Sequence, residues 1–360
     1  MGIRAMASAP AVRASRQVSS VRCGNVVLPP RFLPWQSLRM AALAPDGGRP
    51  RLRLVPDPPA APARPLLGAV EMLPGQVRAA LVDRAGKLLR RTAAGFDPAA
   101  REAAGVDAAV RQAARECFDG CELTGVGVAA AGLVDPERGS FIEVNEVPAL
   151  RGYPVAEVLR RALGVPVYVE HRARLQVLGD RWFGAGRGLE SFASVSTGEV
   201  LGVGVFFDGE LLAPHGGRSG AHMTVLAGGE LCTCGARGCW KTVATTRWLR
   251  QRARAAGLGA EVTLAELVRR GDGGRPVVEE YADNLALGLV NIQQLFAPGL
   301  FVLHGEAVEG GEGFRARVEE RLRRDSGWST AAPPRVVLGE AGRPDDVALL
   351  GGAGLVLTHR

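Results

Sequence analysis

Short apolar runs alternate with amphipathic or alanine-rich stretches along this chain, and the alternation begins abruptly at Leu66. Apolar runs bounded by glycine or proline turns predict strands, and longer periodic stretches predict helices. The expected strands are residues 66–70, 77–83, 125–132, 165–169, 192–196, 202–207 and 300–303, with one more after a turn at 84–87. The expected helices are residues 98–117, 155–163, 173–183, 242–256, 263–270 and 276–296. This alternation favours an α/β fold whose sheets are largely covered.

The pattern divides the 360 residues into a tail and two α/β lobes. Residues 1–65 form the tail, residues 66–185 the first lobe and residues 186–343 the second. A C-terminal helix over residues 344–358 is expected to pack back on the first lobe. No sequence repeat between the lobes is strong enough to claim.

Composition narrows the class of protein. Hydrophobic residues make up 47% of the chain, which supports a sizeable core. No apolar run approaches the ~18 residues that a membrane-spanning helix needs, so we expect no membrane association. Cys23, Cys117 and Cys121 lack the spacing of a disulfide framework, which favours a reducing, cytoplasmic location.

The positive charge belongs to the tail. Residues 1–65 contain ten arginines, no lysine and two aspartates, so their formal net charge is +8 and that of the remainder is −1. Eleven of the 23 prolines lie in the same segment, which favours a poorly ordered extension without a specific role. Three alternatives remain open: an organellar transit peptide, a basic arm that contacts phosphates, or a wrongly assigned start codon.

A cluster of potential metal ligands stands out in the second lobe. Three of the six cysteines, Cys232, Cys234 and Cys239, fall within eight residues, and His222 precedes the first by ten positions. Cys₃His is a common tetrahedral ligand set for structural zinc. Gly235 and Gly238 supply the backbone freedom that a tight Cys-x-Cys turn requires. The alternative is three reduced cysteines that pack as small apolar side chains.

With these segments in place, the chain resembles the ROK family of bacterial sugar kinases, sugar-responsive repressors and their relatives. The resemblance covers about residues 66–358 and is carried mainly by residues 222–225 with 232–239. Residues 169–184, residues 125–135 and the strand pair at 66–83 support it. It implies a two-lobed actin-like ATPase fold with ribonuclease H-like lobes. It also implies that His222, Cys232, Cys234 and Cys239 bind one structural zinc ion, with no open coordination position and so no Lewis-acid role.

The same comparison implies that the catalytic base is missing. ROK kinases carry Glu-Asn-Asp-Ala-Asn, in which the aspartate takes the proton from the sugar hydroxyl. This chain reads Glu170-His171-Arg172-Ala173-Arg174, so an arginine occupies the position of the base. A guanidinium stays protonated and accepts no proton. The neighbour His171 has a suitable ordinary pKa, but it lies one residue away from the base position.

The resemblance also implies that several residues that bind sugar and nucleotide in ROK kinases are replaced in this chain. Ser219 and Lys241 stand where the family has glutamates that bind sugar hydroxyls, which leaves His222 and Asn145 as candidate sugar ligands. The family's first phosphate loop, Asp-x-Gly-Gly-Thr, is replaced by residues 71–76, which include Pro74. The second loop reads Ser196-Thr197-Gly198-Glu199-Val200-Leu201-Gly202, where Glu199 would repel phosphate. Thr197, Gly198, Gly202 and Gly305 remain candidate nucleotide contacts, and ATP with Mg²⁺ is not expected to bind.

Three functions follow from this resemblance. The first is a non-catalytic regulator, a pseudokinase that senses a sugar or sugar phosphate and forms homodimers or tetramers like its relatives. Residues 1–65 contain no pair of amphipathic helices joined by a short turn, so we expect DNA contact only through the basic tail or a partner. The second is an active ATP-dependent sugar kinase, which retains the fold but lacks the base. The third is a zinc-stabilised interaction scaffold without a small ligand.

Overall fold

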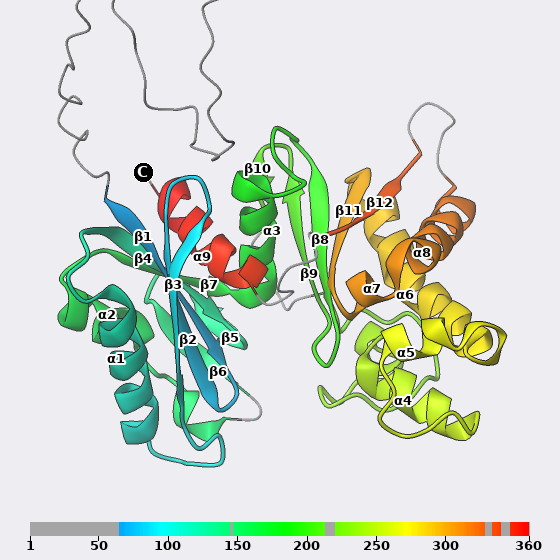
Figure 1. Ribbon diagram of the computed structural model, residues 1–360, viewed down its shortest axis with the longest axis horizontal. Helices are drawn as coiled ribbons and strands as arrows, with labels where there is room; N and C mark the ends of the chain where they lie inside the picture. Colours follow the sequence, from blue (N-terminus) through cyan, green and yellow to red (C-terminus); the bar gives the residue numbers. More distant parts are fainter. Residues whose placement is uncertain (1–64, 145–146, 213–219, 328–332, 340–345, 360) are drawn as a thin grey trace, which may run out of the picture. The chain divides into compact units, whose positions relative to one another are not determined.

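The computed structural model describes residues 65–144, 147–212, 220–327, 333–339 and 346–359 (Figure 1). Two five-stranded mixed sheets form its framework. The strands are β1 (Leu66–Leu73), β2 (Gln76–Val82), β3 (Leu88–Gly95), β4 (Leu123–Ala130), β5 (Leu133–Asp135), β6 (Ser140–Glu143), β7 (Val167–His171), β8 (Phe192–Thr197), β9 (Gly202–Phe207), β10 (Glu210–Leu211), β11 (Leu300–Gly305) and β12 (Arg335–Leu338). The helices are α1 (Ala104–Phe118), α2 (Val155–Leu163), α3 (Arg172–Phe183), α4 (Thr246–Ala255), α5 (Leu264–Arg269), α6 (Arg275–Phe296), α7 (Glu306–Glu309), α8 (Gly311–Asp325) and α9 (Asp346–Thr358). Three short 3₁₀ turns lie at Pro148–Leu150, Trp240–Thr242 and Gly271–Gly273.

The two sheets have the same strand order. The first runs β3-β2-β1-β4-β7 and the second β10-β9-β8-β11-β12. In each, the first three strands of the lobe form an antiparallel meander, and the next two add in parallel beside the first strand. Parallel strands need a crossover connection, and helices supply it in both lobes. The topology is therefore repeated although the sequence shows no repeat.

Both faces of the first sheet are covered. Val70 and Met72 of β1 point into a core built with α1 and α2. The alternate residues Leu67 and Ala69 pack with α9 on the opposite face, and Figure 1 shows α1 and α2 on one side of this sheet with α9 on the other. Alternation of side chains along a strand explains why one strand contributes to both cores.

Helix α9 carries apolar residues on all its sides because it is enclosed. It packs against β1 and β4 of the first sheet and against α3. A Cβ atom on Gly352 would lie 2.7 Å from the carbonyl oxygen of Gly127, and one on Gly351 would lie 1.9 Å from that of Leu175. The glycines thus let α9 approach both its neighbours more closely than any other residue would allow.

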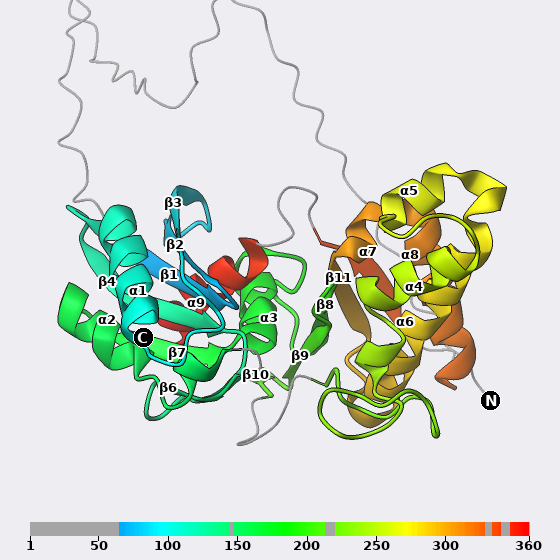
Figure 2. The same ribbon diagram turned by 90° about the horizontal axis from the view of Figure 1, so that it is seen from below.

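The second sheet has its own core. The 22-residue helix α6 buries Leu285, Ala286 and Leu289 with the sheet residues Val195 and Phe301. On the other face, Leu175 and Leu178 of α3 pack with Phe192, Phe206 and Val302. Figure 2 gives a second view of α6 against β11. Helix α3 therefore takes part in packing with the elements of both sheets.

The structure corrects several element boundaries. The helix expected over residues 98–117 begins only at Ala104, because the Asp97 carboxylate accepts the backbone N–H of Ala99 and holds a turn there. The strand expected over 165–169 is β7, Val167–His171, and the helix expected over 242–256 starts at Thr246 after a 3₁₀ turn. Six of the described elements were not expected from sequence: β5, β6, β10, α7, α8 and β12.

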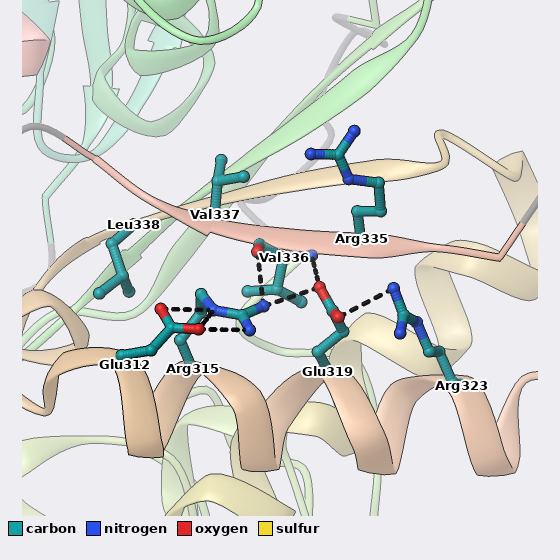
Figure 3. A pocket seen from close by; sticks show the side chains of 8 residues that line it. All are labelled: Glu312, Arg315, Glu319, Arg323, Arg335, Val336, Val337 and Leu338. Atoms are coloured by element: carbon teal, nitrogen blue, oxygen red, sulfur yellow. Dashed lines mark hydrogen bonds and ion pairs between the residues drawn. The ribbon is translucent and has the colours of Figure 1, made fainter.

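At the end of the second sheet, α8 holds strand β12 through side chains. Val336 turns its backbone groups away from β11: its N–H donates to Glu319 Oε2 at 2.8 Å, and its carbonyl accepts from Arg315 at 3.0 Å. Glu319 also pairs with Arg315 and Arg323 (Figure 3). These charged side chains line a pocket of about 440 Å³.

Within the part of the chain that the structure describes, no helix combines the length and apolar character needed to cross a membrane.

Candidate functional site

The arginine at the expected base position forms an ion pair in the interior of the first lobe. Arg172 is the first residue of α3, directly after β7. Its Nε donates to Glu71 Oε1 at 2.6 Å, and Glu71, on β1, has no solvent-exposed side-chain surface. The carboxylate that Arg172 meets is therefore fixed by the sheet and not by a mobile loop.

Glu71 is held from its other side as well. Arg78 lies opposite it on β2 and donates to Glu71 Oε2 at 2.9 Å. Arg78 also lies 3.6 Å from Asp346, the first residue of α9, which pairs with Arg91 of β3. Both oxygens of Glu71 are thus neutralised by guanidinium groups. A carboxylate whose two oxygens are both bound by guanidinium groups is a poor ligand for magnesium.

His171 caps the N-terminus of α3. Its Nδ1 accepts the backbone N–H of Ala173 at 3.2 Å, which satisfies one of the first amides of the helix. Burial, together with the positive charges of Arg174 and Arg172, lowers the pKa of His171 to about 4. An imidazole with so low a pKa and an acceptor nitrogen already in use is a weak proton acceptor at neutral pH.

Replacing His171 with asparagine should make the protein more resistant to acid. An unfolded histidine titrates near pH 6.5, whereas the pKa of the folded one is about 4, so the unfolded state binds more protons between these values. Native stability is therefore lost as pH falls from 6.5 towards 4, by about 3 kcal/mol in full, and is unaffected above 6.5. Asparagine keeps the cap without titrating. Urea unfolding of both proteins at pH 7.5 and pH 4.5 measures the effect, and an unchanged loss in the variant would contradict it.

The residues proposed for nucleotide contact are engaged in contacts within the protein. The Thr197 hydroxyl donates to the carbonyl of His304 at 2.6 Å and accepts the backbone N–H of Ala307 at 2.8 Å. Thr197 lies opposite Gly305 in the β8–β11 ladder, and a Cβ atom on Gly305 would lie 2.0 Å from the Thr197 carbonyl oxygen. Gly202 pairs with Ser196 at the start of β9. These close contacts account for the glycine at position 305.

The loop after Thr197 is tied to α4. The carbonyl of Gly198 accepts the backbone N–H of Thr246 at 3.0 Å, and Glu199 pairs with Arg250. The Glu199 carboxylate is thus part of a link between this loop and α4. The pairing with Arg250 compensates the charge of the carboxylate at this loop.

The four candidate metal ligands come together in space. The ligand atoms of His222, Cys232, Cys234 and Cys239 all lie within 4.8 Å of one another. The Cys232 sulfur lies 3.5 Å from His222 Nδ1, and the sulfurs of Cys234 and Cys239 lie 3.6 Å apart. Bond lengths of ~2.3 Å to sulfur and ~2.0 Å to nitrogen in a tetrahedron place ligand atoms about 3.3–3.8 Å apart. The set could therefore hold a metal ion of the zinc class.

Tight turns produce this geometry. Gly235 donates its N–H to the carbonyl of Cys232, and Gly238 donates to that of Glu230. Gly235 and Gly238 have φ values of +87° and +69°, and a Cβ atom on Gly238 would lie 1.7 Å from the Leu226 carbonyl oxygen. Only glycine fits at position 238 without displacing this backbone.

The chemistry of the cluster also favours a cation. Burial, together with the neighbouring thiols, raises the pKa of the Cys239 thiol to about 12. Deprotonation of the three thiols at this distance therefore needs a compensating positive charge, which a divalent ion would provide. The residue after Cys239 fastens the cluster to the lobe: Trp240 is fully buried and donates its indole N–H to the carbonyl of Asn284 in α6 at 3.1 Å.

Two of the predicted site residues lie outside the part of the chain that the structure describes. Asn145 and Ser219 lie outside the described residues, and Lys241 follows Trp240 in the 3₁₀ turn after the cluster. The sequence reading had not identified Arg78 as a second partner of Glu71. It also missed a buried link in which Asp180 of α3 accepts from Ser194 Oγ of β8 and lies 2.8 Å from His304 Nε2 of β11. Glu71 and Arg172 are far apart in the sequence, so their spacing gave no sign that they form an ion pair.

Comparison with known proteins places this geometry in a family. Residues 68–359 match the ROK family. The glucokinase of Streptomyces coelicolor is 30% identical over 215 residues, which cover 54% of this chain and 68% of that protein. A crystal structure of a ROK family glucokinase from Streptomyces griseus in complex with glucose and AMPPNP has a TM-score of 0.68 and 26% identity, with 81% of this chain and 99% of that chain covered. A ROK family transcriptional regulator, a homologue of the E. coli MLC protein, has a TM-score of 0.71 at 20% identity, with 81% and 78% covered, and supports the fold alone. The chain, which has the α/β sugar-kinase fold with mixed sheets, belongs to the ROK family.

Proposed function

We propose that this chain is a non-catalytic ROK protein that senses a carbohydrate ligand and acts in regulation, with one zinc ion as a structural element. The observation that carries the proposal is the ion pair between Arg172 and Glu71. At the position to which the family resemblance assigns the general base, the side chain is a cation bound to an interior carboxylate.

The neighbouring groups support the same reading. Removing a positioned base lowers a rate by about 10²–10⁴-fold, and neither His171 nor Glu71 is available to replace it. Thr197 of the second loop is bonded to His304 and Ala307, and Glu199 is paired with Arg250. The proposed zinc element has a structural role that needs no catalytic activity, because Trp240 beside it is bonded to Asn284 of α6.

Incubation with ATP, Mg²⁺ and a panel of hexoses tests the proposal. We expect no phosphorylation above background from the wild-type chain. Turnover that is present in the wild type and abolished in His171→Asn would overturn the proposal and make the chain an active kinase with His171 as its base.

Thermal melting with the same sugars separates a sensor from a scaffold. A ligand that binds the folded state raises the melting temperature. A reproducible rise with a carbohydrate supports sensing. If no member of the panel changes the melting temperature, the zinc-stabilised interaction scaffold becomes the better description.

A further inference from the structure

We propose that Cys234 is a site of oxidation by hydrogen peroxide, and that the disulfide it then forms with Cys239 releases the metal ion from the cluster. This inference goes beyond carbohydrate sensing, and it rests on the zinc element of the proposed function. It adds a reversible thiol modification to a cluster whose proposed role is otherwise structural.

The three thiols of the cluster differ in their exposure to solvent. Cys232 is 5% exposed and Cys239 is fully buried, whereas Cys234 is only partly buried. A tight turn produces this difference. Cys232 donates its backbone N–H to the carbonyl of Ala236 at 2.7 Å and accepts that of Gly235 at 2.9 Å. Because Cys234 lies within this turn, a small oxidant reaches its sulfur before it reaches the other two.

The sulfur of Cys234 has a second thiol at close range. It lies 3.6 Å from the sulfur of Cys239, while the Cys232 sulfur lies 3.5 Å from His222 Nδ1. A disulfide bond of ~2.0 Å requires the first pair of sulfurs to approach by about 1.5 Å. Two glycines with positive φ values lie between these cysteines in the sequence, and a glycine backbone adjusts with little steric resistance. The geometry therefore favours a disulfide between residues 234 and 239.

The oxidation takes two steps. Metal coordination keeps the thiols deprotonated, and the thiolate is the form that attacks a peroxide. The Cys234 thiolate attacks one peroxide oxygen, so that an S–O bond forms, the O–O bond breaks and the leaving hydroxide takes a proton; the sulfur is oxidised to a sulfenic acid as the peroxide is reduced. The Cys239 thiolate then attacks this sulfur, so that an S–S bond forms and the S–O bond breaks. The second hydroxide also takes a proton, and the sum is one disulfide and two water molecules.

Oxidation leaves too few ligands for the metal ion. Of the four candidate ligands, only His222 and Cys232 would remain, and structural zinc requires four. The loop would stay attached to the protein, because Trp240 donates its backbone N–H to the carbonyl of Met223 at 2.9 Å and its indole N–H to that of Asn284 at 3.1 Å. Reduction of the disulfide by a dithiol should therefore allow the site to bind zinc again.

The other described cysteines lack this arrangement. Cys117 is fully buried, and burial raises the pKa of its thiol to about 11. Cys121 is partly buried, as Cys234 is, but its thiol donates to the carbonyl of Asp119 at 3.6 Å and it is not a member of the metal-ligand set. Cys121 is therefore the matched control for exposure.

Treatment of the reduced, zinc-loaded full chain with hydrogen peroxide tests this inference. We expect one equivalent of zinc per chain to pass to a chelating dye, at a rate proportional to the peroxide concentration. Trypsin cleaves after Arg237, which separates Cys239 from the peptide that contains both Cys232 and Cys234. Mass spectrometry should find the two peptides joined through Cys234, with Cys232 still free to be alkylated.

Dithiothreitol followed by zinc should restore the metal content, and Cys121→Ser should release zinc at the wild-type rate. The inference is overturned if bound zinc withstands peroxide that oxidises glutathione, if the disulfide includes Cys232, or if Cys234 ends as a sulfinic acid, which dithiothreitol does not reduce. Reduced protein that binds no zinc would contradict the zinc element of the proposed function. Bound zinc that peroxide leaves in place contradicts only the oxidation site.

Discussion

Cys234→Ser should lower the zinc content from one equivalent per chain to less than about 0.2 and reduce the melting temperature by more than about 10 °C. A thiolate is a strong zinc ligand and a serine hydroxyl a weak one, so the remaining three side chains hold the ion poorly. The loss spreads beyond the turn because Cys239 is followed by Trp240, which is buried against α6. Elemental analysis of dialysed protein and thermal melting measure the two effects.

Cys121→Ser is the control for this experiment. Cys121 is a partly buried cysteine three residues after the end of α1, remote in sequence from the metal cluster. It should change neither the zinc content nor the melting temperature by a comparable amount. An unchanged metal ratio in Cys234→Ser, or equal effects of the two variants, would remove the assignment of zinc to this cluster.

Glu71→Ala should destabilise the protein by about 3–5 kcal/mol. The variant leaves Arg172 without its carboxylate in the interior, and Arg78 loses the nearer of the two acidic partners that it has among the described residues. Removing one member of a buried ion pair is costly because the other charge remains desolvated. Urea unfolding followed by circular dichroism gives the difference in free energy.

The comparison variant is Glu143→Ala, which removes a surface partner of Arg151. Both side chains of that pair are largely exposed, so its loss should cost no more than about 1 kcal/mol. Equal effects of the two substitutions would show that the Glu71 network is no more important than a surface ion pair. That result would also weaken the argument that Arg172 is held in a fixed orientation.

Local pattern was sufficient to predict most strands and helices, but not those whose form depends on distant neighbours. Helix α9 was expected from its composition, yet its apolar surface on all sides is explained only by its burial between β1, β4 and α3. Strand β12 has four residues, and its position follows from its pairing with β11. The helix expected from residue 98 begins at 104 because a single aspartate bonds the chain into a turn. The sequence alone does not tell whether the amides after Asp97 bond to its side chain or to helix carbonyls.

The candidate site shows a similar division. The four metal ligands were identified from spacing because three of them lie within eight residues and share one turn. The ion network was not, because Glu71, Arg78, Arg172 and Asp346 come from four separate elements. Sequence spacing carries no information on pairs that meet through the folding of a sheet. The division of the chain into lobes at residue 185 stays a prediction.

The side chains of α8 that bind Val336 have a consequence for how this protein associates with others. An open strand edge offers its N–H and carbonyl groups to any extended peptide, which leads to fibres or unwanted dimers. At β12 those groups are already occupied by Glu319 and Arg315, so a foreign strand would have to break a charged network before it could pair with Val336. The second sheet is therefore closed at this residue to lengthening by a foreign strand.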